Sequence, residues 1–139
     1  MNTVNLNRRL HTLCAGLLLL AAAGLAGAGD LYVVCNAGVA LQATEVRDVF
    51  LGEKGFAGTV RLVPADNSAS QAAFLEKVMK LDAAKYNGLW TKKSFRDGAT
   101  PPTVKGGDAE ALTFVKQTPG ACSYLSSAPG GGVTVIGKF

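Results

Sequence analysis

The first 28 residues limit what this chain can fold into. Arg8 and Arg9 precede an apolar run over residues 13–25, and the Ala-Gly-Ala triplet at 26–28 has the small-x-small pattern of a cleavage site. The run is shorter than the roughly 18 to 20 apolar residues that a membrane span needs. We therefore predict a signal peptide over 1–28, one folded domain over 29–139 and a periplasmic or secreted location. A retained membrane anchor is the alternative.

Cleavage would also remove the one histidine, His11, and one of the three cysteines, Cys14. Without histidine, the exported domain lacks Ser-His-Asp and Cys-His nucleophilic sites and zinc sites with histidine ligands. It also lacks a Cys-x-x-Cys redox motif and the glycine spacing of a phosphate-binding P-loop. We therefore expect a protein that is not an enzyme, with no catalytic residue, metal site or cofactor.

Two cysteines, Cys35 and Cys122, remain after cleavage. Both fall in predicted strands, so either a disulfide or a pair of buried free thiols fits the sequence. The basic residues fall from 14 to 12 when Arg8 and Arg9 leave, against 10 acidic residues. This near balance gives no reason to expect a nucleic-acid partner.

Strand-like and helix-like segments alternate along residues 29–139. Continuous apolar or β-branched runs predict strands, and apolar residues at helical spacing predict helices. The predicted strands cover 31–35, 59–63, 121–125 and 133–136. The predicted helices begin at Thr44, after Asp66-Asn67-Ser68, at Asp82 and at Asp108, and residues 97–107 are expected to form a loop. The alternation predicts an α/β domain with a mostly parallel sheet flanked by helices.

Several short motifs follow one another in a recognisable order. They are EVRDVFLG at 45–52, VPAD at 63–66, FLEKV at 74–78, YNGLW at 86–90, a stretch with paired prolines at 95–102, and TPGA at 118–121. In this order the chain resembles phosphate-type periplasmic solute-binding proteins, the substrate-binding components of phosphate ABC transporters. The resemblance implies a periplasmic-binding-protein-like (type II) fold, of which this chain has the length of a single lobe. It also implies phosphate or a similar oxyanion as ligand and a membrane transporter as partner.

The candidate ligand-binding residues come from two loops. Hydroxyls and backbone amides at a helix start favour an anion, and Ser68, Ala69 and Ser70 open the helix after the second predicted strand. Asn36 and the amide of Gly38 are expected to approach them from the loop after the first strand. The alternative is that these are ordinary capping residues. The side chain of Asp66 would accept a hydrogen bond from a protonated phosphate, but its charge would repel an anion that brings no proton.

Two departures from the family pattern affect the ligand. Gln71 stands where related small members carry arginine, which removes a charge-assisted contact, and Ser123 replaces a glycine. A single lobe also lacks the second wall of a closed cleft. The alternative function is therefore an interaction module that contacts another envelope protein. Lys92, Lys93 and Arg96 form either a basic patch for such a contact or a solvated helix end.

Overall fold

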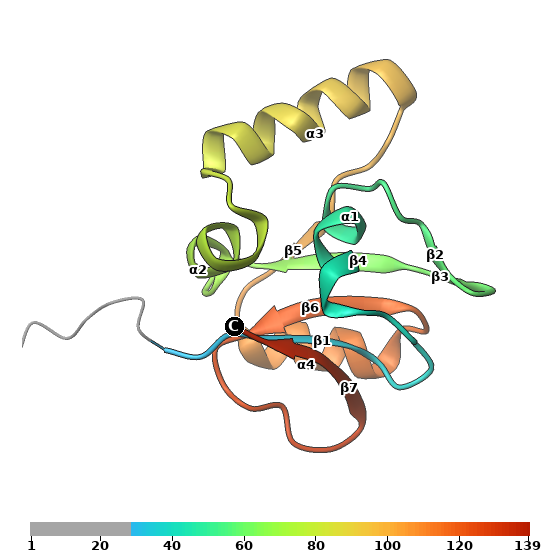
Figure 1. Ribbon diagram of the computed structural model, residues 1–139, viewed down its shortest axis with the longest axis vertical. Helices are drawn as coiled ribbons and strands as arrows, with labels where there is room; N and C mark the ends of the chain where they lie inside the picture. Colours follow the sequence, from blue (N-terminus) through green and yellow to red (C-terminus); the bar gives the residue numbers. More distant parts are fainter. Residues whose placement is uncertain (1–28) are drawn as a thin grey trace, which may run out of the picture.

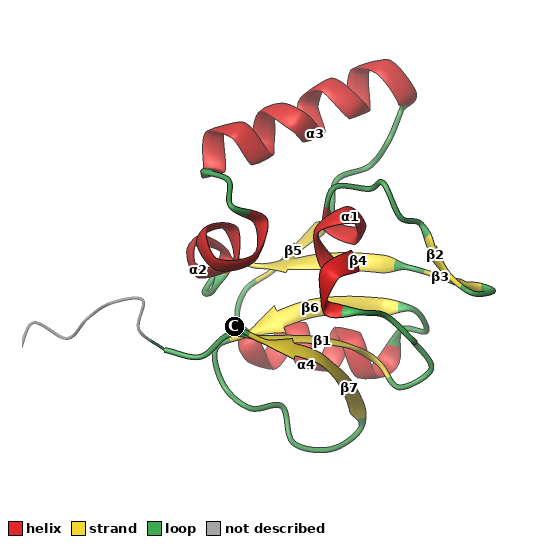
Figure 2. Cartoon of the chain, viewed as in Figure 1, coloured by secondary structure: helices red, strands yellow, loops and turns green. Residues whose placement is uncertain are grey.

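The computed structural model describes residues 29–139, so the predicted signal peptide lies outside the described residues (Figure 1). The strands, coloured yellow in Figure 2, are β1 (Tyr32–Asn36), β2 (Phe56–Ala57), β3 (Val60–Arg61), β4 (Val63–Asn67), β5 (Thr103–Lys105), β6 (Ala121–Leu125) and β7 (Val133–Lys138). The α-helices are α1 (Val46–Phe50), α2 (Gln71–Phe74), α3 (Ala83–Asp97) and α4 (Asp108–Gln117). A 3₁₀ turn, η1 (Ala43–Glu45), precedes α1, and a π-helical turn, η2 (Leu75–Met79), continues α2.

Five strands form one mixed sheet in the order β5-β4-β6-β1-β7. Strand β4 is parallel to β5 and to β6, whereas β1 is antiparallel to β6 and to β7. The α/β class predicted from the sequence is confirmed. The expected mostly parallel sheet is not, because β1 runs against its two neighbours and half of the strand pairings are antiparallel. Strands β2 and β3 form a separate hairpin.

Helices cover both faces of the sheet (Figure 1). On one face, α4 packs Ala111 and Val115 against Val34, Ala121 and Leu125. On the other face, α1, α2, η2 and α3 enclose the larger core. Its fully buried members include Val33, Val49, Phe50, Phe74, Met79 and Tyr124. Successive side chains of a strand point to opposite faces of the sheet and so enter the two cores in turn, as expected for a sheet buried on both faces.

A disulfide joins Cys35 of β1 to Cys122 of β6. The two residues stand directly opposite each other in the antiparallel ladder, with Cα atoms 4.0 Å apart. Of the two states that the sequence left open, the structure shows the paired one. Because the cysteines are 87 residues apart in sequence, the bond closes a loop that includes most of the domain.

Helix α3 is the longest helix of the described chain, and it lies farthest from the sheet in Figure 1. The side chain of Asp82 caps its start by accepting a hydrogen bond from the amide of Lys85 at 2.8 Å, as the sequence predicted. Tyr86 and Trp90 are its buried residues, and Trp90 Nε1 donates to the carbonyl of Phe50 at 3.2 Å. These two aromatic side chains therefore attach α3 to the rest of the fold.

Strand β4 lies further along the chain than the sequence predicted. Residues 60–61 belong to the β2–β3 hairpin, and β4 continues through Pro64 to Asn67. The amide of Val63 donates to Gly120 on the β6 side, so the nitrogen of Pro64 faces the opposite side. On that side β5 pairs with β4 only from Ala65 onward. The sheet therefore needs no hydrogen bond from the nitrogen of Pro64.

Candidate functional site

Asp66 is a buried acid at the carboxyl end of strand β4, which lies between β5 and β6. Its side chain is 3% exposed and accepts hydrogen bonds from two tyrosines on other elements. The hydroxyl of Tyr86, on α3, donates to its Oδ2 at 3.0 Å, and the hydroxyl of Tyr124, on β6, donates to its Oδ1 at 2.9 Å. One carboxyl group therefore connects the sheet to the outlying helix.

Burial is the main influence on the protonation of this acid. Removal from water raises the pKa of Asp66 above its ordinary value, and the two tyrosine hydrogen bonds oppose that shift without cancelling it. Burial, together with the charge of Asp66, raises the pKa of both tyrosines, so they remain protonated donors. The three groups thus form a hydrogen-bonded unit in which Asp66 is the group that titrates.

This unit makes stability depend on the protonation of Asp66. Its pKa in the folded state lies above the ordinary value of 3.8, so between these two values the folded protein binds more protons than the unfolded chain. Stability should therefore fall as the pH rises through that interval. We expect Asp66→Asn to abolish this part of the pH dependence of stability, because asparagine does not titrate.

Urea unfolding of both proteins, from about pH 3.5 to pH 7, measures the component as a difference between two curves. The exposed acid Asp97 supplies the control, because Asp97→Asn should leave the Asp66 component in place. A wild-type protein that gains stability relative to Asp66→Asn as the pH rises would contradict the assignment.

Asp66 lines a pocket of about 500 Å³ between α3, the start of α2 and strand β5. Polar side chains in its wall include Gln71, Asn87 and Thr91, and apolar side chains include Trp90 and Phe95. The volume is within the range of small-ligand sites. Asp66 is the charged side chain among the lining residues, so the pocket holds an acid and no cation.

The predicted helix start, Ser68 to Ser70, lies directly after Asp66, but its backbone amides are already engaged. Ser68 donates to the carbonyl of Lys105 at 2.9 Å, Ala69 to Asn67 Oδ1 at 3.1 Å, and Ser70 to the carbonyl of Asn67 at 3.0 Å. Ser68 is exposed, whereas the hydroxyl of Ser70 is buried and has no hydrogen-bond partner within residues 29–139. Of the anion-favouring groups predicted in this turn, the hydroxyl of Ser68 is open to solvent.

Asn36 and Gly38 lie at the opposite end of the sheet from Asp66. Because β1 is antiparallel to β6, its carboxyl end lies beside the start of β6. Strand β4 is parallel to β6, so its carboxyl end lies at the opposite end of the strands. The Nδ2 atom of Asn36 instead donates to the carbonyl of Val115, at the end of α4, at 2.9 Å. Ser68, Ala69 and Ser70 therefore follow Asp66 in the chain without lining its pocket, and Asn36 and Gly38 lie apart from all of them.

A second acid, Asp108, holds the loops around the end of β4 in place. It begins α4 and accepts hydrogen bonds from Asn67 Nδ2 at 2.8 Å, from the amide and hydroxyl of Ser126 at 3.0 and 2.8 Å, and from the hydroxyl of Ser127 at 3.1 Å. Burial acts to raise the pKa of Asp108, but these hydrogen bonds lower it overall. Through these hydrogen bonds the carboxylate of Asp108 connects β4, α4 and the loop after β6.

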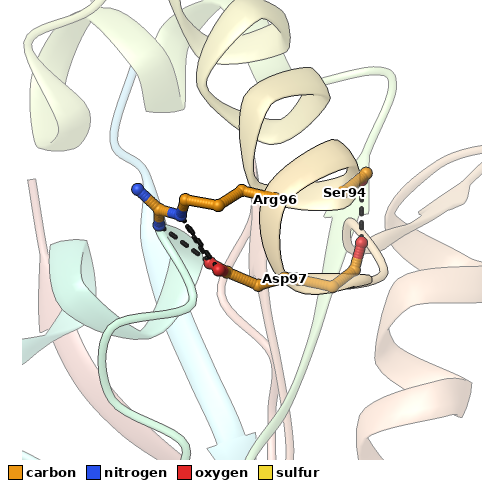
Figure 3. Close-up of polar contacts among 4 residues, drawn as sticks. Ser94, Arg96 and Asp97 are labelled. Atoms are coloured by element: carbon orange, nitrogen blue, oxygen red, sulfur yellow. Dashed lines mark hydrogen bonds and ion pairs between the residues drawn. The ribbon is translucent and has the colours of Figure 1, made fainter.

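The carboxyl end of α3 borders the pocket and is fixed by local contacts (Figure 3). Ser94 Oγ donates to the carbonyl of Ala99 at 2.8 Å, which ties the helix end to the loop that follows. Arg96 and Asp97 form an ion pair at 2.8 Å, and both side chains are largely exposed. The predicted basic patch therefore has one of its three cations paired with a neighbouring acid.

Within residues 29–139, no three histidine, cysteine, aspartate or glutamate side chains gather as they would around a metal ion. The same part of the chain contains no helix long and apolar enough to cross a membrane. No protein-family model matches the chain, and a search of the curated proteins found no similar sequence.

Proposed function

We propose that this chain is an exported protein of the solute-binding type that takes phosphate or a similar protonated oxyanion at the Asp66 pocket. The observation that carries the proposal is the buried carboxyl group of Asp66, held by two tyrosines in the wall of a pocket of about 500 Å³. Transfer of the ligand to a membrane transporter would follow from the resemblance to phosphate-binding proteins.

The chemistry of Asp66 favours an anion that carries its own proton. At neutral pH phosphate retains a proton that it can donate to a carboxylate, whereas sulfate has none and would meet only repulsion. The side-chain amides of Gln71 and Asn87, in the same pocket, can donate to the remaining oxygens of the ligand. Asp66 would therefore make the pocket prefer phosphate to sulfate, and neutral donors would form the hydrogen bonds to the other oxygens of the ligand.

A thermal melt with phosphate, sulfate or chloride at matched ionic strength tests the proposal. At ten times its dissociation constant a ligand stabilises the folded state by about 1.4 kcal/mol, which raises the melting midpoint of a domain of this size by roughly 6 °C. We expect this shift with phosphate only. In Asp66→Asn the preference for phosphate over sulfate should disappear, whereas Asp97→Asn should behave as wild type. Equal shifts with phosphate and sulfate in the wild-type protein would overturn the proposal.

The second candidate function is an interaction module for another envelope protein. The observation that favours it is the exposed apolar surface at the mouth of the same pocket, where Phe95 is 94% exposed and Val104 is 63% exposed. Phe95 and Val104 line the pocket together with Pro101 and Pro102, and apolar side chains that gather in one exposed patch are typical of contact surfaces. The absence of a phosphate shift in the melt would favour this function over solute binding.

A further inference from the structure

A second pocket lies on the other side of the sheet from Asp66. It is bordered by strand β3, the start of β4, the loop after α3, strand β5 and helix α4, and its volume is about 430 Å³. Side chains alternate along β4, so Val63 lies on the α4 face of the strand, whereas Asp66 lies on the α3 face. Val63 and Phe114 give this pocket an apolar wall. Its volume is again within the range of small-ligand sites.

Charge distinguishes this pocket from the others. Arg61 and Lys105 both line it, and none of its lining residues is acidic. The four other pockets described for residues 29–139 each contain at least one carboxylate. Neither Arg61 nor Lys105 forms a salt bridge within the described part of the chain. The positive charge of the pocket is therefore not paired within its lining, and the carboxylate of Glu110, in the adjoining pocket, accepts a hydrogen bond from the amide of Gly106.

The two cations differ in how they are placed. Lys105 Nζ lies 4.3 Å from the centre of the Phe114 ring, so its ammonium group is held against the pocket wall. Arg61 is exposed on the β2–β3 hairpin, and its planar guanidinium can give two parallel hydrogen bonds to a carboxylate or a phosphate. Thr100 and Thr103 also line the pocket and add polar side chains to its wall.

We propose that the Arg61–Lys105 pocket binds a small organic anion. Its carboxylate or phosphate head group would contact Arg61 and Lys105, and its apolar body would pack against Val63 and Phe114. This site is distinct from the Asp66 pocket and does not depend on the oxyanion function proposed there. The Asp66 pocket selects its ligand through an acid, whereas this pocket attracts its ligand through two cations.

An NMR titration of the ¹⁵N-labelled protein tests this proposal with three probes of similar shape: benzoate, phenyl phosphate and the neutral benzamide. We expect both anions to shift the amide signals of Arg61, Thr103, Lys105 and Phe114 in a saturable manner. The comparison of benzoate with phenyl phosphate identifies the preferred head group. Benzamide should bind at least about tenfold more weakly, because it cannot form the charge-assisted contacts. Affinity for the anions should fall when salt is raised, because the pocket is open to solvent.

Two charge-removing variants and two controls complete the experiment. Arg61→Gln and Lys105→Gln should each weaken anion binding by about five- to tenfold and leave the melting midpoint close to that of wild type. Lys92→Gln and Lys93→Gln, on α3, should bind as wild type does. Equal binding of benzamide and benzoate, unchanged binding by both pocket variants, or shifts centred on Asp66 and Tyr86 would each overturn the proposal. Shifts at Asp66 and Tyr86 on addition of inorganic phosphate bear instead on the function proposed for that pocket.

Discussion

Removal of the disulfide between Cys35 and Cys122 should lower the free energy of unfolding by about 4 kcal/mol. The bond restricts the unfolded chain over a separation of 87 residues, and the entropy removed from the unfolded state grows with the length of the closed loop. For a domain of this size, a change of that magnitude lowers the melting midpoint by roughly 15 to 20 °C. The double variant Cys35→Ala/Cys122→Ala and the reduced wild-type protein should show this loss to a similar extent.

Urea or thermal unfolding with and without a reductant measures the effect of the disulfide. The double alanine variant is its own control, because a reductant should leave its stability unchanged. Both sulfur atoms are buried, so alanine also removes some packing, and the variant should be slightly less stable than the reduced wild type. A wild-type midpoint that does not respond to complete reduction would show that the bond contributes nothing to stability.

Local signals in the sequence were sufficient to predict most of the elements. Helix α3 begins after the predicted cap Asp82 and ends at Asp97, directly before Gly98, which has a φ of +65°. Strand β6 has the predicted bounds, and the Pro-Gly before it has a steric reason. Gly120 has a φ of +78°, a backbone conformation that favours glycine, so glycine at this position is a local turn signal. Signals of this kind depend on neighbours in sequence, so they can be interpreted without a structure.

Two features of the sheet depend on distant pairing and could not be predicted in this way. The direction of β1 is set by its ladders with β6 and β7, which begin 89 and 101 residues further along the chain. Strand β5 has only three residues and follows Pro101 and Pro102, so the sequence indicated a loop. It is a strand because the end of β4 offers it a pairing edge. Because both features depend on long-range contacts, the sequence analysis expected a mostly parallel sheet and did not predict strand β5.

The candidate site was predicted in part. Asp66 was identified from its place after a strand and before a helix, whereas the predicted turn from Ser68 to Ser70 does not line the Asp66 pocket. Tyr86 and Tyr124, which bind Asp66, are 20 and 58 residues away in sequence, and tyrosines in apolar segments resemble ordinary core residues. The pairing of Asn36 with this turn depended on a parallel β1, so it failed with that assumption. Only the fold could show which polar groups share a pocket.

Phe74 is the core side chain whose truncation should have the largest effect on the region around Asp66. Its ring is fully buried and stacks on Tyr124 with ring centres 3.9 Å apart, and its centre lies 4.7 Å from the centre of the tilted Phe50 ring. Replacement of a buried phenylalanine by alanine leaves a cavity, and we expect Phe74→Ala to lower the free energy of unfolding by about 3 to 5 kcal/mol. The cavity would also remove support for the Tyr124 ring and so loosen its hydrogen bond to Asp66.

The matched control is Phe95→Ala, because Phe95 is 94% exposed and loses almost no buried area. Its stability should lie within about 0.5 kcal/mol of wild type in urea unfolding at pH 7. Near-UV circular dichroism of the folded variants reports the packing of the aromatic rings, which should change in Phe74→Ala and not in Phe95→Ala. Equal stability losses in the two variants would mean that Phe74 is not the packing centre of this core. A large loss in Phe95→Ala would mean that Phe95 is covered in solution, which would point to a second molecule on that surface.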